Sequence, residues 1–219
     1  MRLVDQSPRL SRDLDCSELR GRPVREEWVR EALSPQAARQ VVLGVERIVR
    51  RGTASLSFLV RCRSLTGGEE IPITVSVNWE EPLVLAPERQ SIELPNGAQV
   101  RVPVVHRAER CAEKVRAFLE RGEASDAHDL HWFGSRVLEP KDWDVLPNLT
   151  RKKVRLLRVP QSTDLHRRFE DMRVNAREQW RRGQGLVVVA DLPAWEEVHQ
   201  QLTRCKRLVP QHLPSRSRR

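Results

Sequence analysis

Alternation of hydrophobic and polar residues marks much of the first half of the chain, a pattern typical of half-buried β-strands. Three runs carry it, at residues 41–49, 55–63 and 71–79, with glycine-containing turns between them. A further pair of runs within residues 91–105 flanks Asn96-Gly97, a residue pair that favours a two-residue hairpin turn. We therefore expect a short, mostly antiparallel sheet that holds the three runs and the hairpin.

Helical spacing of the hydrophobic residues replaces this alternation from residue 107 onward. Residues 107–121 place apolar side chains on one face and end before Gly122, which favours a helix that glycine terminates. Helices are expected over 24–33, 107–121, 125–133 and 164–182, with a last one capped by Asp191. Residues 186–190 predict a short buried strand. The helices at 107–121 and 125–133 are expected to pack against the sheet.

The tryptophans divide by their surroundings in these patterns. Trp28, Trp180 and Trp195 lie on apolar faces of predicted helices and are assigned to the core. Trp79 and Trp132 stay open between packing and stacking on a base.

The two patterns together predict an α+β fold, because strands dominate the first part of the chain and helices the second. The boundaries that we expect are a core over residues 1–138, a helical, basic C-terminal subdomain over 139–210 and a disordered basic tail over 211–219. A chain of 219 residues is long enough for one such domain with a small appendage.

Composition excludes several classes of protein. No apolar run approaches the roughly 18 residues that a membrane-spanning helix needs, and charges stand where a signal peptide would be apolar. The four cysteines are far apart, without metal-binding spacing, so we expect reduced thiols. These features predict a cytoplasmic protein without membrane contact.

Positive charge is concentrated in the last third of the chain. The net charge is +9, and residues 151–219 hold 17 Lys and Arg against seven Asp and Glu. This asymmetry suggests an anionic partner, with RNA or another nucleic acid as the first candidate. Only five of the 39 basic residues are Lys, so a bias in nucleotide composition is the alternative explanation.

The segment RLSRDLDCSE, residues 9–18, carries the first candidate chemistry. On an extended backbone Asp13 and Asp15 project from the same face, about 7 Å apart along the strand. Two such carboxylates can share a divalent metal ion, as phosphoryl and nucleotidyl transfer require. The alternative is an acidic pair in a surface loop.

The segment ERCAEKVRAFLERGEASDAHDL, residues 109–130, carries the second. Lys114 lies mid-helix among apolar residues, where its ammonium can neutralise charge on a phosphate. Asp126 and Asp129 are spaced to share one face of the next helix. The alternative is an amphipathic helical hairpin with solvated charges. His128 and His131 share the same spacing and are weaker candidates for a metal site.

In order and spacing these segments, with the strand IPITVSVNWEEPL at 71–83, resemble the AbiEii/AbiGii-type nucleotidyltransferase toxins of the DNA-polymerase-beta-like superfamily. The family's Arg-x-Ser-x-Asp-Leu-Asp element is matched by Arg9, Ser11, Asp13, Leu14 and Asp15. Its aromatic-x-Glu-Pro strand end is matched by Trp79, Glu81 and Pro82. Its Ala-Glu-Lys helix and Asp-x-x-Asp-Leu are matched by Ala112, Glu113, Lys114, Asp126, Asp129 and Leu130.

The resemblance covers about residues 1–135 and implies a nucleotidyltransferase core that uses Mg²⁺ and a nucleoside triphosphate (NTP). It implies that Asp13 and Asp15 hold the metal, that Lys114 contacts phosphate, and that Asp126 or Asp129 completes the pocket. Arg9 and Ser11 join Lys114 as expected substrate contacts. The resemblance also implies a toxin with a separately encoded antitoxin, and tRNA as an acceptor.

Three departures from the family pattern bear on activity. Met1 falls where the residue after Gly-Gly-Thr-Ala would stand, so we expect an N-terminally truncated core without the glycine turn. Ser76 stands at the third-acid position, and Ser125 replaces the arginine of Arg-Asp-x-x-Asp. Two functions therefore stay open: a nucleotidyltransferase toxin, with activity lowered by these changes, or a non-catalytic relic of the same fold that binds RNA or protein.

Overall fold

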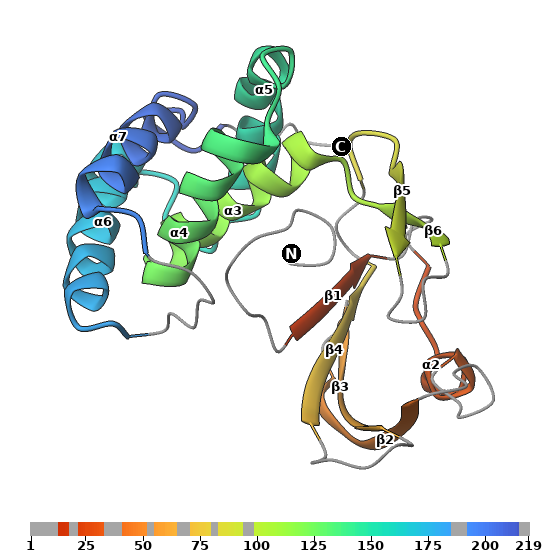
Figure 1. Ribbon diagram of the computed structural model, residues 1–219. Coiled ribbons are helices and arrows are strands. Elements are labelled where there is room, and N and C mark those ends of the chain that lie inside the picture. Colours follow the sequence, from red (N-terminus) through yellow and green to blue (C-terminus); the bar gives the residue numbers. More distant parts are fainter. Residues whose placement is uncertain are drawn as a thin grey trace. The chain divides into compact units, whose positions relative to one another are not determined.

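The computed structural model describes residues 13–17, 22–32, 41–51, 55–64, 71–79, 83–93, 99–184 and 192–214. The described residues up to Leu83 form one compact unit, here called the sheet unit, and those from Val84 onward form another, the helical unit. Figure 1 labels the elements of both. No helix within these ranges is long and apolar enough to cross a bilayer.

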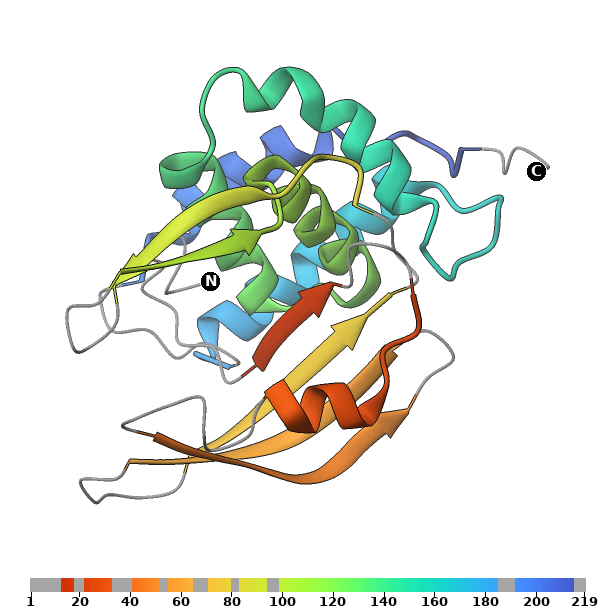
Figure 2. The same cartoon turned by 90° about the vertical axis from the view of Figure 1, so that its right-hand side faces the viewer.

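The sheet unit is built on four strands in the order β1-β4-β3-β2 (Figure 2). Their bounds are β1 Asp13–Ser17, β2 Val41–Arg51, β3 Ser55–Ser64 and β4 Ile71–Asn78. The strands β2, β3 and β4 pair antiparallel, as the alternation predicted, and β1 adds a parallel edge strand beside β4. The sheet is therefore mixed, and the strand that carries Asp13 and Asp15 lies directly beside the strand that carries Ser76.

The apolar face of this sheet packs against α2 (Glu26–Ala32). Phe58 is fully buried there and shares a core with Val29 of α2. Trp28, in contrast, is 52% exposed, with the Arg25 guanidinium 5.5 Å from its ring, so its assignment to the core was wrong. A helix of seven residues buries one narrow face, and Val29, about 100° further round, occupies it. Trp79 is half-buried and packs against the same core.

The strands β5 (Glu88–Glu93) and β6 (Gln99–Val104) form the predicted hairpin. The prediction that this hairpin joins the main sheet was wrong, because it forms a separate two-stranded sheet in the helical unit. The segment before β5 is tied to the helices. Both carboxylate oxygens of the buried Glu109 accept backbone N–H groups of Val84 and Leu85, at 2.9–3.0 Å. Lys153 lies 2.8 Å from the same carboxylate, so charge and hydrogen bonds hold this connection to the helices.

The helical unit contains five α-helices and one π-helix in its described part. Their bounds are α3 Arg107–Arg121, α4 Ala124–Trp132, η2 Phe133–Val137, α5 Asp142–Val154, α6 Leu165–Arg181 and α7 Trp195–Lys206. They share one core, in which Phe118 of α3 and Phe169 of α6 lie with ring centroids 4.9 Å apart. Helices α6 and α7 both contact α4 (Figure 1).

The helix predictions are confirmed at α3, at α4 and at α6, where Asp164 is the N-cap. The α7 prediction was wrong at its start, because Ala194 is the N-cap and not Asp191. The predicted strand at 186–190 lies outside the described residues. Trp180 and Trp195 pack against the core as expected. The helix α5, with Pro147 inside it, was predicted only as part of a helical region.

The turn between α3 and α4 is fixed in two ways. Gly122 adopts φ +60°, a left-handed conformation that glycine tolerates best, and its N–H donates to the carbonyl of Phe118. The last carbonyls of α3 are capped by α6, through Arg168 to Leu119 at 2.6 Å and Asn175 to Gly122 at 3.1 Å. This turn sets the position of α4 relative to α3, and with it the geometry described next.

Candidate active site

Asp13 and Asp15 occupy alternate positions of β1, the edge strand of the four-stranded sheet. In the parallel register Asp13 pairs with Thr74 and Asp15 with Ser76. Ser76 pairs in turn with Ser57 of β3, and the two hydroxyls lie 3.0 Å apart in a hydrogen bond. Asp15 is exposed, so its carboxylate is available to a ligand beside this row of hydroxyls.

The oxygen ligands that the residues of β1 and β4 offer suit a magnesium ion whose remaining ligands come from substrate and water. Among the described residues no group of three or more His, Cys, Asp or Glu side chains is arranged to hold a metal. Mg²⁺ commonly binds through one or two carboxylates, water and substrate phosphates, and does not need a closed protein cage. The pair on β1 meets that requirement, while Ser76 adds an oxygen without a negative charge.

Lys114 of α3 is held by two acids of α4. Its ammonium Nζ lies 2.9 Å from Asp129 Oδ2 and 3.7 Å from Asp126 Oδ1. Both aspartate side chains are fully buried, whereas Lys114 is 25% exposed. The acids therefore lie behind the ammonium, and the alternative of a hairpin with solvated charges does not describe this arrangement.

Arg121, which the sequence analysis did not single out, is part of the same cluster. Its Nε and Nη2 each donate to one oxygen of Asp126 at 2.7 Å, while half of the side chain remains exposed. The hydrogen bonds that Arg121 donates to Asp126 raise the pKa of Arg121, so its charge is permanent. Arg121 follows Lys114 by seven residues, two helical turns, and this spacing was the available signal.

His128 and His131 do not form a metal site with other described residues. His128 is buried, stacks near Trp180 with centroids 6.2 Å apart, and has its Nδ1 3.7 Å from Asp129. Burial lowers the pKa of His131, and the neighbouring His128 lowers it further. His128 therefore belongs to the packed interior beside Asp129, and His131 is half-buried near it.

The candidate residues are distributed over the two units. Asp13 and Asp15 belong to the sheet unit, and Lys114, Asp126 and Asp129 belong to the helical unit. The structure thus brings the lysine and its two acids together within one unit. That Asp13 and Asp15 join them in one cleft stays a prediction, and Arg9 and Ser11 lie outside the described residues.

Comparison with known proteins gives a family and two similar structures. The family model described as nucleotidyl transferase AbiEii toxin, type IV toxin–antitoxin system, matches residues 1–201. The nucleotidyltransferase toxin MenT4 of Mycobacterium tuberculosis is 25% identical, with a TM-score of 0.61 over 94% of this chain and 74% of that one. JHP933 of Helicobacter pylori, 16% identical, shares the fold with a TM-score of 0.52 over 91% of this chain and 75% of its own. No curated protein matches the sequence.

Proposed function

The chain belongs to the AbiEii family of nucleotidyltransferase toxins of type IV toxin–antitoxin systems, and on that basis we propose a magnesium-dependent transfer of a nucleotide from an NTP to an RNA acceptor such as tRNA. Such a transfer forms a bond between an acceptor oxygen and the α-phosphorus and releases pyrophosphate. Negative charge therefore grows on the leaving pyrophosphate. The protein partner that the family implies is an antitoxin.

The observation that carries the proposal is the position of Lys114 in front of two buried acids. Asp126 and Asp129 orient the ammonium before any substrate arrives, so little ordering remains to be done when phosphate binds. A cation fixed in this way stabilises charge that develops on a phosphate oxygen. In this proposal Lys114 contacts the triphosphate, and Asp126 and Asp129 are positioning residues.

Arg121 extends this role to a second cation. Its two bonds to Asp126 leave N–H groups on a half-exposed guanidinium, and arginine matches the geometry of phosphate oxygens. Because Asp126 contacts both cations, it couples the orientations of the two side chains. We assign Arg121 to the triphosphate beside Lys114, in place of the family arginine for which Ser125 stands here.

On the sheet unit, Asp13 and Asp15 are the residues that would hold Mg²⁺. The bound ion supplies positive charge to the phosphates. Two observations support this assignment: Asp15 is exposed, and it pairs in register with Ser76, whose hydroxyl is hydrogen-bonded to that of Ser57. Arg9 and Ser11 precede this strand and remain proposed substrate contacts.

The neutral Ser76 at the third-acid position favours a second candidate, a catalytically inactive module of the same fold that binds RNA or protein. Label transfer from each of the four NTPs to bulk tRNA separates the two functions. The wild type should transfer label, whereas Asp15→Ala and Lys114→Ala should each lower the rate by about 100-fold or more. Lys141→Ala, a 73% exposed lysine paired with Glu139, is the matched control and should leave transfer unchanged.

Absence of transfer by the wild type with all four NTPs would favour the binding module. Transfer that survives Asp15→Ala would remove the metal assignment, and transfer that survives Lys114→Ala would remove the phosphate assignment. A growth assay adds a cellular readout, because toxicity should follow the same order among the variants.

A further inference from the structure

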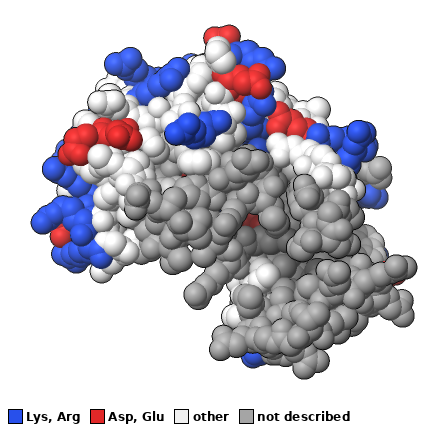
Figure 3. Space-filling model, viewed as in Figure 1, with Lys and Arg blue, Asp and Glu red and all other residues white. Residues whose placement is uncertain are grey.

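Six described basic side chains of the last third are already engaged within the protein. Lys153 is 3% exposed between Glu109 and Glu113, and Arg168 donates to backbone carbonyls at the end of α3. Further pairs with acids are made by Arg173 and Lys206, both with Glu170, and by Arg181 and Arg182, both with Glu178. In Figure 3 several basic groups of the helical unit likewise stand directly beside acidic ones. The net charge of this third therefore overstates the cations that a partner can reach.

Four further cations lie close together at the end of α5 and in the loop after it. Arg151, Lys152, Arg155 and Arg158, here called the α5 patch, are all exposed and lie within eight residues that contain no acid. Within the part of the chain that the structure describes, none of the four side chains makes an ion pair or hydrogen bond. The favourable effect of cations at a helix C-terminus accounts for Arg151 and Lys152 in the last turn, but Arg158 lies beyond the helix.

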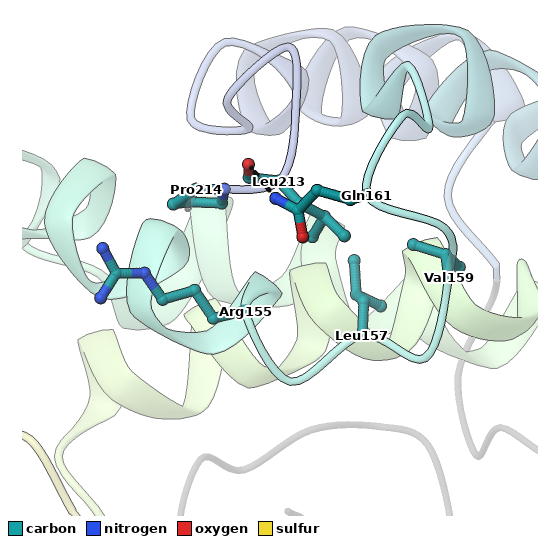
Figure 4. Close-up of a pocket in the computed structure, with 6 residues that line it drawn as sticks. All are labelled: Arg155, Leu157, Val159, Gln161, Leu213 and Pro214. Carbon is teal, nitrogen blue, oxygen red and sulfur yellow. Dashed lines mark hydrogen bonds between the residues drawn. The ribbon is translucent and has the colours of Figure 1, made fainter. Parts of the chain in front are cut away.

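A hollow of about 270 Å³ adjoins the patch (Figure 4). Its wall includes Leu157 and Val159 from the loop, with Leu213 and Pro214 from the C-terminal segment, and Arg155 lines one end with its guanidinium directed away from Leu157. Gln161 joins the two walls by donating to the carbonyl of Leu213 at 2.8 Å.

Other hydrogen bonds hold the C-terminal segment in place along α6. The carbonyl of Gln211 accepts the N–H of Leu165 at 2.8 Å, and the ring of His166 bonds the carbonyl of Val209 at 2.8 Å. The hollow is thus a formed feature whose walls are joined by a hydrogen bond, with Arg155 at one end.

The size and lining of this region indicate the class of ligand. Pockets for drug-sized molecules measure about 300–1,000 Å³, so this hollow is too small to enclose a whole NTP. A chain of phosphates fits a row of unpaired cations, because the cations contact the phosphate backbone. Arginine favours phosphate and also stacks on bases through its planar guanidinium.

We propose that the α5 patch and the adjoining hollow form a docking surface for RNA. The proposal rests on the proposed function in one respect, since it assigns a place on the protein to the RNA acceptor. The sequence predicted that an anionic partner binds somewhere in residues 151–219. The proposal confines this contact to eight residues, at the end of α5 and in the loop after it.

The test measures binding of fluorescently labelled bulk tRNA by anisotropy at several salt concentrations. The variant Arg151→Gln/Lys152→Gln/Arg155→Gln/Arg158→Gln removes the patch. The control Arg167→Gln/Arg177→Gln/Arg181→Gln/Arg182→Gln removes the same charge from exposed positions on and directly after α6. Four lost phosphate contacts should weaken binding at least tenfold at about 150 mM salt and reduce the slope of log affinity against log salt by about 3. The control should lose less than about threefold.

Equal losses in the two variants would overturn the proposal, because the binding would then follow net charge alone. A second pair of variants tests the hollow. Val159→Asp places a carboxylate in its wall and should weaken RNA binding by about tenfold, whereas Val174→Asp, at a 68% exposed position of α6, should not. Melting temperatures of all variants identify any loss that is due to unfolding.

Two further measurements, vesicle binding and the KM for tRNA, distinguish an RNA-docking surface from a membrane-binding surface and from the proposed enzymatic function. If the patch variant keeps its RNA affinity but loses binding to vesicles of phosphatidylserine and phosphatidylcholine, the surface is for membranes and the proposal falls. If nucleotide transfer occurs with an unchanged KM for tRNA in the patch variant, the surface inference falls while the proposed function stands. If the wild type transfers no nucleotide but binds RNA, and only the patch variant loses that binding, the docking surface is supported. The proposed nucleotidyltransferase activity is then contradicted.

Discussion

At the scale of single residues, the arrangement around Lys114 explains why two aspartates are buried in this hairpin. A buried carboxylate is costly unless it is paired, and here Asp126 binds Arg121 in a bidentate manner while Asp129 lies 2.9 Å from Lys114. The two cations keep part of their surface exposed. The burial of the acids thus fixes the direction of the cations, which is the property that a phosphate site needs.

Asp129→Asn should weaken the hold on Lys114 without removing the lysine. We expect the affinity for ATP to fall about tenfold, because the ammonium loses its main anchor, while the affinity for adenosine stays unchanged. Equilibrium binding of the two ligands measures this difference. Equal losses for ATP and adenosine would indicate a structural role for Asp129 and would contradict its role in positioning.

His131 predicts a dependence of stability on pH. Burial and His128 lower the pKa of His131, so the folded protein disfavours its charged form, while Glu197 opposes this and Arg136 reinforces it. A group with a lowered folded pKa contributes stability above its unfolded pKa, about 6.5 for histidine, and that contribution is lost as the pH falls through the folded pKa.

The melting temperature should therefore fall between about pH 7.5 and about pH 5.5. His131→Gln should show a smaller fall than the wild type, because it removes one group that takes up a proton on unfolding. Thermal unfolding at the two pH values measures the difference, and an equal or larger fall in the variant would contradict the assignment.

At the scale of elements, sequence periodicity predicted most of the helices and strands but not all of their partners. Residues 107–121 and 164–182 are strongly amphipathic, and α3 and α6 begin and end within one residue of these ranges. The alternation around Asn96-Gly97 predicted the β5–β6 hairpin but assigned it to the wrong sheet. Alternation indicates which face of a strand is buried, but not which element covers that face. The segment before β5 is held by Glu109, which accepts N–H groups of Val84 and Leu85 about 25 residues away, and alternation cannot predict such a non-local contact.

The candidate site residues could be predicted from the sequence where they form a local motif. Their roles could not be predicted where these depend on packing between distant segments. Lys114, Asp126 and Asp129 were identified from their spacing, and the structure brings them together. The burial of both acids, which places them behind the lysine, depends on the core formed with α6 and α7. Arg121 was missed because an arginine at the end of a helix is usually a solvated charge near the C-terminal dipole.

The turn at Gly122 provides a prediction about the connection that sets this geometry. A Cβ at Gly122 would lie 2.9 Å from the Cα of Met172, whereas a Cβ at Gly183 would meet nothing within 4 Å, and both residues have positive φ. Gly183→Ala should therefore cost about 1 kcal/mol from backbone strain alone, and Gly122→Ala about 2–4 kcal/mol. Urea denaturation measures both, and equal costs would show that the contact with α6 does not constrain the turn.

At the scale of the whole molecule, we propose that residues of the sheet unit and of the helical unit act on the same bound nucleotide. The sheet unit supplies the carboxylates of β1, and the helical unit supplies the cations of α3. Nucleotidyl transfer needs both at the same triphosphate, because metal and cations neutralise different parts of its charge. The central claim is therefore that Asp15 and Lys114 meet at one bound nucleotide.

Iron-directed cleavage of the backbone tests this claim most directly. Fe²⁺ replaces Mg²⁺ in the presence of a non-hydrolysable NTP analogue, and ascorbate with peroxide then cuts the chain near the bound ion. A shared active site predicts cuts both at β1 and β4 and in the α3–α4 segment around Lys114, and the loss of both sets of cuts in Asp15→Asn. Cuts confined to β1 and β4, or cuts near Lys114 that persist in Asp15→Asn, would contradict a shared active site.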